Sequence, residues 1–452
     1  MNIGRLFTEV QSHPAIADQR FIGIQFDSRQ LQPGEIFLAI QSDTNDGHHY
    51  VESAIRSGAA AAIVRQDYYD QAPDSLKSCL IPASDPLSLI RRAASDYLSI
   101  LNLKERIAIT GSNGKTSTKE FLYQIMKSYY PCAATVKNFN NHLGLIYSIL
   151  KMPIGIEYGI FEIGTNHPGE IAPLAELIRP TIAIITGIGY SHIEFFHDLE
   201  TIAREKCSML HFMQGSAIAV FRAENDLLDR TVRAIPKIQA LSFSLDENLQ
   251  APYTYRTTER GLISNGQEFT TTLDFFALHS NLAAAITCAR ILKIPDAVIQ
   301  IAVSYLKLPD KRLNLENTGR LLIMNDCYNA NPDSMTLALQ TMVRISIHYR
   351  KKVWLVLADM LELGQASEEL HCQVGTVIAS HAARWKGILT RGTYAGHYTA
   401  GLDPEQVITG HYKDNDQLWH TLVSRLEPGD IVLVKGSRGM ALDGIVKELL
   451  KW

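Results

Sequence analysis

Short runs of apolar residues alternate along this chain with longer segments in which apolar residues recur every three or four positions. In the first hundred residues the short runs are "FIGIQF", "EIFLAI", "AAAIV" and "CLIPA", whereas "PLSLIRRAASDYLSIL" has helical spacing. The alternation returns from about residue 104 with "RIAIT", "YGIFEIG", "TIAIITGIG" and "SAIAVF". Strands that alternate with helices predict an α/β fold whose mostly parallel sheets are covered by helices on both faces.

A third block with the same rhythm begins near "RLLIMNDCYNANPDSM" and continues to "DIVLVKGSRGM". The preceding segment, residues 306–319, has Pro, Gly and little apolar periodicity, so we predict that it is a linker. A chain of 452 residues is long enough for about three domains. We therefore predict three α/β domains in series: a small N-terminal domain at 1–102, a central domain with a mostly parallel sheet at 103–312, and a Rossmann-like domain at 313–452.

Composition narrows the class of protein. A net charge of -4 shows no overall bias towards nucleic acid or anionic membranes. The N-terminus lacks an apolar core of signal-peptide length, and no stretch approaches 18 apolar residues, so we expect a cytoplasmic protein that does not insert into membranes. Its six cysteines have no CxxC spacing, which favours free thiols over a disulfide framework or a zinc site.

A glycine-rich stretch follows the strand-like "RIAIT" and precedes a helical pattern. Glycines in such a strand–loop–helix unit let backbone N–H groups turn towards an anion. Lys115 would then reach the outer phosphates of a nucleotide, and the Thr116 hydroxyl would bind Mg²⁺. Ile109 stands where the standard pattern has its first glycine, so this is a shorter GxxGKT form. The alternative is a tight turn with a surface lysine. The predicted nucleotide-binding residues of the loop are Gly111, Ser112, Asn113, Gly114, Lys115, Thr116 and Ser117.

The loop segment "TGSNGKTSTKE" resembles the nucleotide loop of the Mur ligases, enzymes that add amino acids or dipeptides to the peptidoglycan precursor. The resemblance extends nearly from end to end through "KNFNNHLG", "FEIGTNHPGEI", "GIGYSHIEFF", "CYNANPDSM", "DMLELG" and "KGSRGM". It implies a monomeric ligase that uses ATP and two Mg²⁺ ions to join D-alanyl-D-alanine to UDP-N-acetylmuramoyl-tripeptide through an acyl phosphate. The first domain would bind the UDP-substrate and the second ATP. Whether the third residue of the tripeptide is meso-diaminopimelate or lysine stays open.

Three charged residues beyond the loop are candidates for the catalytic and metal-binding set. Glu162 follows the strand-like "YGIF"; alone it could equally be a solvated charge, but the nearby glycine loop favours a metal ligand. His192 could be a half-buried loop histidine, and the resemblance assigns it to a second cation. Lys206 would by default be an exposed charge, whereas the resemblance implies a carbamate formed with CO₂. Ser208 replaces an acidic residue that the family usually has. With Lys115 these three form the predicted catalytic group, and with Thr116 the predicted metal ligands.

Polar clusters in all three blocks are candidates for substrate and nucleotide contact. Taken alone they could cap helices or turns, but the resemblance favours binding. The predicted contacts to the UDP-tripeptide or dipeptide are Ser28, Arg29, Asp46, Gly47, His48, Asn138, Asn140, Asn141, Lys435, Ser437 and Arg438. The further predicted contacts to ATP are Asp326, Asn329, Asn331 and Arg312.

Three other readings differ from this one in testable ways. Folylpolyglutamate synthase has GKGS where this chain has GKTS, and the diaminopimelate- or lysine-adding ligase has a DNPR motif that is absent here. A phosphate-loop switch would hydrolyse nucleotide without a UDP-sugar domain. Turnover of ATP in the absence of both other substrates would favour the switch.

Overall fold

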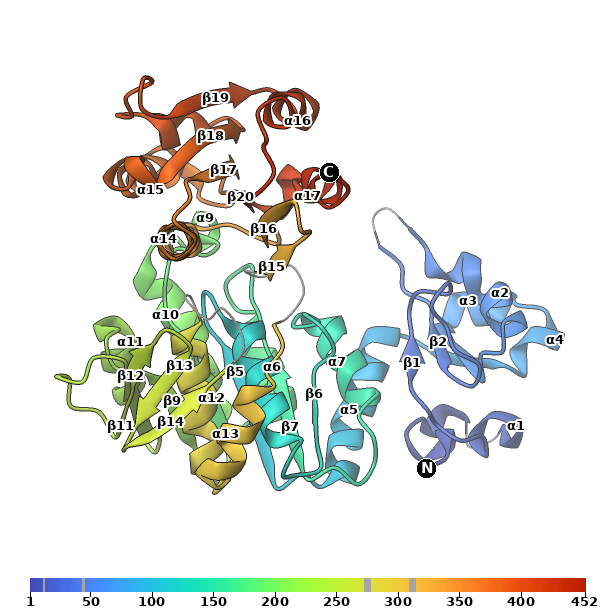
Figure 1. The fold of residues 1–452 in the computed structure, drawn as a ribbon. Helices are drawn as coiled ribbons and strands as arrows, with labels where there is room; N and C mark the ends of the chain where they lie inside the picture. The colour runs from blue at the N-terminus through green and yellow to red at the C-terminus, as the bar shows by residue number, and fades with distance from the viewer. Residues whose placement is uncertain (11–12, 43–44, 272–277, 309–313) are drawn as a thin grey trace.

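The computed structural model describes residues 1–10, 13–42, 45–271, 278–308 and 314–452, arranged as three bodies along the chain (Figure 1). The blue N-terminal body lies beside the cyan-to-yellow central one, and the orange-to-red C-terminal body lies above the latter. Within the described residues, no helix has the length and apolarity that crossing a membrane requires. The predicted α/β class is confirmed.

The N-terminal sheet has four parallel strands in the order β1-β2-β3-β4. Its longest helix, α5, begins after Asp85, whose carboxylate accepts the N–H of Leu87, and ends at left-handed Asn102. One apolar core includes residues of both α5 and α7, which joins this body to the central one. The elements are α1 (Pro14–Ala17), β1 (Ile24–Gln25), β2 (Ile36–Leu38), α2 (Val51–Arg56), β3 (Ala61–Arg65), α3 (Gln66–Gln71), α4 (Asp74–Lys77), β4 (Leu80–Ala83) and α5 (Pro86–Leu101).

The central sheet has seven parallel strands in the order β11-β10-β9-β8-β5-β7-β6. Strand β5 lies between β7 and β8, so the strand order reverses there and the carboxyl ends form the usual ligand crevice. The strands are β5 (Glu105–Thr110), β6 (Cys132–Ala134), β7 (Tyr158–Glu162), β8 (Ile182–Ile185), β9 (Ile218–Arg222), β10 (Gln239–Ser244) and β11 (Tyr253–Thr254). The helices are α6 (Lys115–Met126), α7 (His142–Leu150), α8 (Ile171–Ile178), α9 (Ile193–Phe196), α10 (Leu199–Cys207), α11 (Asp226–Arg233), α12 (His279–Ile291) and α13 (Asp296–Ser304).

A small antiparallel sheet, absent from the sequence prediction, is attached to the central body. Its strands are β12 (Arg256–Thr258), β13 (Gly261–Ser264) and β14 (Gln267–Thr270). Asn265 and Gly266 connect β13 to β14, and both have positive φ, 53° and 75°. Asn-Gly with this backbone is the usual two-residue hairpin turn, so a local signal for the hairpin was present.

The C-terminal sheet has the order β15-β16-β20-β17-β18-β19, and only β15 is antiparallel to its neighbour among these described strands. The predicted linker at 306–319 is therefore wrong in part, because residues 314–317 form β15. Strand β15 lies at the edge of the sheet and is held there by backbone pairing with β16. It therefore shows no repeat of apolar residues from which the sequence could predict it. The elements are β15 (Asn314–Asn317), β16 (Leu321–Asp326), α14 (Pro332–Tyr349), β17 (Val353–Ala358), α15 (Ser367–Ser380), β18 (Trp385–Arg391), β19 (Ile408–Tyr412), α16 (Asn415–Val423), β20 (Asp430–Lys435) and α17 (Asp443–Leu449).

Candidate active site

The glycine loop lies at the carboxyl end of β5, which pairs with β7 and β8 in the central sheet, and leads directly into α6. Gly111 and Gly114 have φ values of 144° and 80°, which favour glycine. A Cβ on Gly111 would lie 2.0 Å from Oγ1 of Thr186, and one on Gly114 would lie 2.1 Å from Nδ2 of Asn281. Asn281 also donates to the carbonyl of Gly114 at 3.1 Å. Backbone angles and close packing therefore both require glycine in this loop.

Polar side chains of the loop hold its shape. The Lys115 ammonium donates to the carbonyl of Gly111 at 2.7 Å, so the side chain curls back over the loop. The Ser112 hydroxyl donates to the Gly189 carbonyl and accepts the Gly189 N–H, both at 2.9 Å. Ser117 is buried at the start of α6. The predicted phosphate loop is thus anchored to the segment that follows β8.

Glu162, the last residue of β7, is completely buried beside this loop. Its Oε1 accepts the Thr116 hydroxyl at 3.0 Å and the Asn140 amide at 2.9 Å. Its Oε2 accepts no hydrogen bond from the described residues, and Lys119 Nζ is 3.7 Å away. A hydroxyl and a carboxylate with an unsatisfied oxygen are the donors that Mg²⁺ prefers. The residues therefore fit a magnesium ion.

Lys206, near the end of α10, is fully buried. Burial lowers its pKa well below the usual value of 10.5, and the charge of Lys115 lowers the pKa further. An amine in this environment is favoured in its neutral, nucleophilic form. Ser208 stands where the resemblance would place an acidic residue. Its hydroxyl donates to the Glu205 carbonyl at 2.6 Å, and the residue caps the C-terminus of α10.

His192 lies at the start of α9 with a positive φ of 58°. Its Nδ1 is 2.5 Å from Oε2 of Glu362, which belongs to the C-terminal body. This hydrogen bond lowers the pKa of Glu362. Among the described residues, no group of three His, Cys, Asp or Glu side chains gathers as a metal site. Of the predicted metal ligands, Thr116 therefore contacts Glu162. His192 instead contacts Glu362 of the C-terminal body.

Other contacts join the C-terminal body to the glycine loop. The amides of Asn113 and Asn331 bond reciprocally, at 2.8 and 3.2 Å. Asp333 accepts the N–H of Tyr190 at 3.0 Å, and burial raises its pKa. Asn138 donates to the Tyr328 hydroxyl. These contacts bring the start of α14 directly onto the nucleotide loop.

Predicted residues of the C-terminal body meet at the ends of β16 and β20. Asp326 pairs with Lys435 in register, and Lys435 Nζ is 2.6 Å from the Asp326 carboxylate. Lys435 also donates to the carbonyl of Asn329 at 3.0 Å. The Ser437 hydroxyl accepts the Leu361 N–H at 2.9 Å. This cluster holds the loop before α14. Arg438 is exposed, and Arg312 lies outside the described residues.

Residues predicted from the first domain have local partners. Arg29, with 86% of its side chain exposed, forms a two-point ion pair with Asp27 beside half-buried Ser28. His48 Nδ1 is 2.6 Å from Asp46, and His48 Nε2 accepts the Arg65 N–H at 3.0 Å. A Cβ on Gly47, between Asp46 and His48, would collide with the backbone of Ile40 at 2.7 Å. These contacts explain the loop's shape, and substrate binding there stays a prediction.

Sequence reasoning missed several residues that the fold brings to the site. Lys119, one turn after Lys115, is buried and donates to the Thr135 carbonyl at 3.0 Å. Its position in "KTSTKE" was the available signal. Glu362 and Tyr328 contact site residues of the central body. They can therefore be recognised only from the way the two bodies pack together. Asn141, predicted to bind substrate, accepts the Gly144 N–H as the cap of α7.

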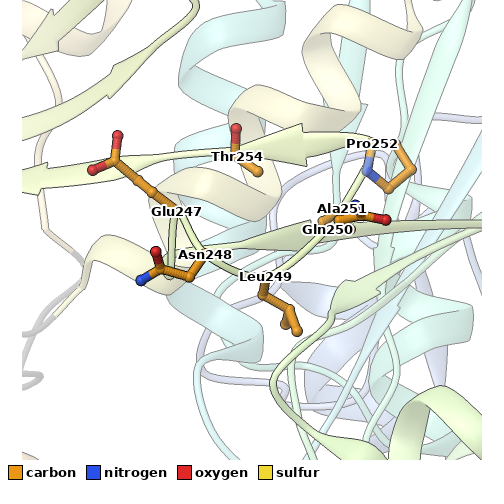
Figure 2. A pocket seen from close by; sticks show the side chains of 7 residues that line it. All are labelled: Glu247, Asn248, Leu249, Gln250, Ala251, Pro252 and Thr254. Atoms are coloured by element: carbon orange, nitrogen blue, oxygen red, sulfur yellow. The ribbon is translucent and has the colours of Figure 1, made fainter.

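A hollow of about 490 Å³ lies elsewhere, beside the loop between β10 and β11. Figure 2 shows that its side chains, among them Glu247, Leu249 and Thr254, point away from one another. None of the site residues above lines it. We therefore place the chemistry at the carboxyl edge of β5 and β7.

The chain is similar to models of one family along most of its length. The matches are the Mur ligase family catalytic domain over residues 20–95, the Mur ligase middle domain over 109–289 and the Mur ligase glutamate ligase domain over 311–438. UDP-N-acetylmuramoyl-tripeptide–D-alanyl-D-alanine ligase of Bacillus subtilis (strain 168) is 31% identical over 457 residues, covering 100% of this chain and 98% of that protein. The protein of the same name from Rickettsia prowazekii (strain Madrid E) is 30% identical and covers 94% of each chain.

Solved structures have the same fold. MurF from Acinetobacter baumannii superposes with a TM-score of 0.83 at 24% identity, covering 100% of this chain and 99% of that one. MurF ligase from Thermotoga maritima, determined in complex with ADP, superposes with a TM-score of 0.79 at 24% identity, covering 95% and 97%.

Proposed function

This chain belongs to the Mur ligase family, and from that membership we propose that it is the ATP-dependent ligase that joins D-alanyl-D-alanine to UDP-N-acetylmuramoyl-tripeptide. The relatives that match it over their full length carry this name. The product would be the UDP-linked pentapeptide precursor of peptidoglycan, with ADP and phosphate released. We expect a monomer that acts in the cytoplasm, where ATP and the UDP-linked precursor are found.

The observation that carries the proposal is the contact between the glycine loop and Glu162. Ligation requires the carboxylate of the tripeptide to approach the terminal phosphate of ATP. Two unit charges 4 Å apart repel each other by about 4 kcal/mol at an effective dielectric constant of 20. Lys115, the loop N–H groups and the α6 N-terminus would offset this repulsion. The carboxylate then becomes an acyl phosphate, and attack by the dipeptide amine expels phosphate.

Thr116 and Glu162 would hold a first Mg²⁺, and His192 with a modified Lys206 a second. When bound, these ions would neutralise charge on the transferring phosphoryl group. The buried, neutral amine of Lys206 would attack CO₂, forming an N–C bond and releasing one proton to give a carbamate. This replaces a cation that repels a metal with an anion that attracts it. The burial of Lys206 beside Lys115 supports this proposal.

The remaining predicted residues lie in all three bodies, and each group would bind a different substrate or part of a substrate. Ser28, Arg29 and residues 46–48 would contact the UDP-sugar, and Asn138, Asn140 and Asn141 the peptide. Asp326, Asn329 and Asn331 would contact ATP. Lys435, Ser437 and Arg438 would contact the acyl phosphate or the incoming dipeptide. The docked C-terminal body would exclude water from the acyl phosphate.

The test is phosphate release from ATP by the purified protein. We expect release only when both UDP-N-acetylmuramoyl-tripeptide and D-alanyl-D-alanine are present. Comparing tripeptides that end in meso-diaminopimelate and in lysine identifies the accepted third residue. Equal ATP hydrolysis with both substrates omitted would support a nucleotide switch instead and refute the ligase proposal.

A further inference from the structure

Lys119 is a fully buried lysine of α6, and its ammonium contacts three segments of the central body. Nζ donates to the carbonyls of Thr135, at 3.0 Å, and of Lys137, which belong to the segment directly after β6. It also lies 3.7 Å from Oε2 of Glu162, at the end of β7, and 3.0 Å from Oε1 of Glu120. A charge is stable inside a protein only with such partners. This residue therefore joins the helix of the nucleotide loop to two neighbouring strands.

The segment that Lys119 holds has a backbone conformation that needs support. Lys137 has a φ of 49°, in the left-handed region that residues other than glycine adopt at a cost. Its carbonyl is one of the two that accept hydrogen bonds from Lys119. Thr135 adds a contact to β7, because its hydroxyl accepts the Glu162 N–H at 3.0 Å. The ammonium thus stabilises the turn of the chain that leads to Asn138.

The residues directly after this turn reach both the nucleotide loop and the C-terminal body. The Asn140 amide donates to Oε1 of Glu162 at 2.9 Å, and the Asn140 carbonyl accepts the Gly164 N–H at 2.8 Å. A Cβ on Gly164 would lie only 2.8 Å from the Asn140 amide, so the fit is close. Asn138 donates to the Tyr328 hydroxyl of the C-terminal body. Both asparagines therefore lie beside the place where a substrate carboxylate would meet ATP.

We propose that Lys119 is a positioning residue for the UDP-linked substrate. It sets the segment 135–140 against the nucleotide loop, so that Asn138 and Asn140 stand where the tripeptide carboxylate arrives. This inference rests on the proposed function, because it takes these asparagines as contacts to the tripeptide. Lys119 acts through the backbone of the segment and does not touch the substrate. Its charge also compensates the carboxylate of Glu162, and the test has to separate these two effects.

The test places Lys119→Met in two backgrounds, the wild type and Glu162→Gln. Methionine keeps most of the buried stem and removes the ammonium. In the wild type this leaves the carboxylate of Glu162 buried without that cation, which destabilises the fold. In the Glu162→Gln background both charges are absent, so the remaining effect belongs to the donors lost from segment 135–140. Lys127→Met is the matched control, because Lys127 is an exposed lysine directly after the same helix.

Two measurements on the full-length proteins are needed. The first is the binding of UDP-N-acetylmuramoyl-tripeptide and of ADP by isothermal titration calorimetry. The second is hydrogen exchange of the backbone amides in segment 135–140. In both backgrounds Lys119→Met should weaken tripeptide binding about 10-fold, as the loss of one or two hydrogen bonds would, and leave ADP binding unchanged. Exchange in the segment should become faster, and Lys127→Met should alter none of these quantities.

Three results would contradict parts of this account in different ways. Normal tripeptide binding in the double variant, Lys119→Met with Glu162→Gln, would overturn the inference, because the lysine would then only compensate the carboxylate. Equal losses of tripeptide and ADP binding would also overturn it, since they indicate a general loss of structure. A wild-type protein that binds no UDP-tripeptide would instead refute the proposed function.

Discussion

The reciprocal amide pair between Asn113 and Asn331 gives a prediction whose size can be worked out from the structure. Asn331 also caps α14, where its Oδ1 accepts the Ser334 N–H at 2.9 Å. Replacement of Asn331 by alanine would remove both the amide pair with Asn113 and the helix cap. Asn331→Ser preserves the cap, because serine caps helices as well as asparagine does, but its side chain is too short to reach Asn113. Serine therefore isolates the contact between the two bodies.

The two amide hydrogen bonds set the expected effect. Each contributes about 0.5–1.5 kcal/mol, so the pair should be worth about 1–3 kcal/mol, or about 5- to 140-fold in an equilibrium constant. Asn331→Ala should lose about 1 kcal/mol more in unfolding free energy, because it also loses the cap.

The assay is a double-mutant cycle in kcat/KM for ATP with Asn113→Ala, Asn331→Ser and both together. We expect a coupling energy of about 1–3 kcal/mol, with urea unfolding of Asn331→Ser close to that of the wild type. Strictly additive effects of the two substitutions would refute the reasoning. The amide pair would then contribute nothing to docking over the glycine loop.

Three further predictions concern buried ionisable groups. Glu162→Gln should lower kcat by about 100-fold and raise the Mg²⁺ concentration needed for half-maximal rate, and a normal Mg²⁺ titration would contradict its role. Lys206→Ala should be inactive but partly restored by formate or acetate, which can replace a carbamate; an absence of rescue together with no ¹³C signal from labelled bicarbonate in the wild type would argue against modification. Burial lowers the pKa of His371 below 6.5, so the unfolded chain binds the extra proton and the stability present above pH 6.5 should be lost as pH falls below it. His371→Gln should flatten this dependence in urea unfolding at pH 5.5 and 7.5, and parallel losses in both proteins would contradict it.

Elements with strong local signals could be predicted from the sequence. The segment 86–101 has an aspartate cap, a proline at its first position and seven buried residues at helical spacing, and α5 has these bounds. The glycine loop was found for the same reason, because its residue types meet local backbone requirements at Gly111 and Gly114. The hairpin of β13 and β14 was missed although its Asn-Gly turn was a signal, since the surrounding residues alternate poorly.

Contacts between bodies could not be predicted in this way. His192 was assigned a role by resemblance, but its partner Glu362 depends on how two separately folded sheets dock. The same holds for Asn113 with Asn331. The domain boundaries at 102 and 312 and the roles of the site residues stay predictions.

The transfer of oxygen from the tripeptide to phosphate tests the central claim most directly. The substrate would carry ¹⁸O in the carboxylate that becomes the new peptide bond, and the released phosphate would be analysed by mass spectrometry. If that carboxylate attacks the ATP bound at Lys115 and Thr116, one ¹⁸O atom should appear in phosphate for each peptide bond formed. Unlabelled phosphate accompanying peptide bond formation would contradict the account.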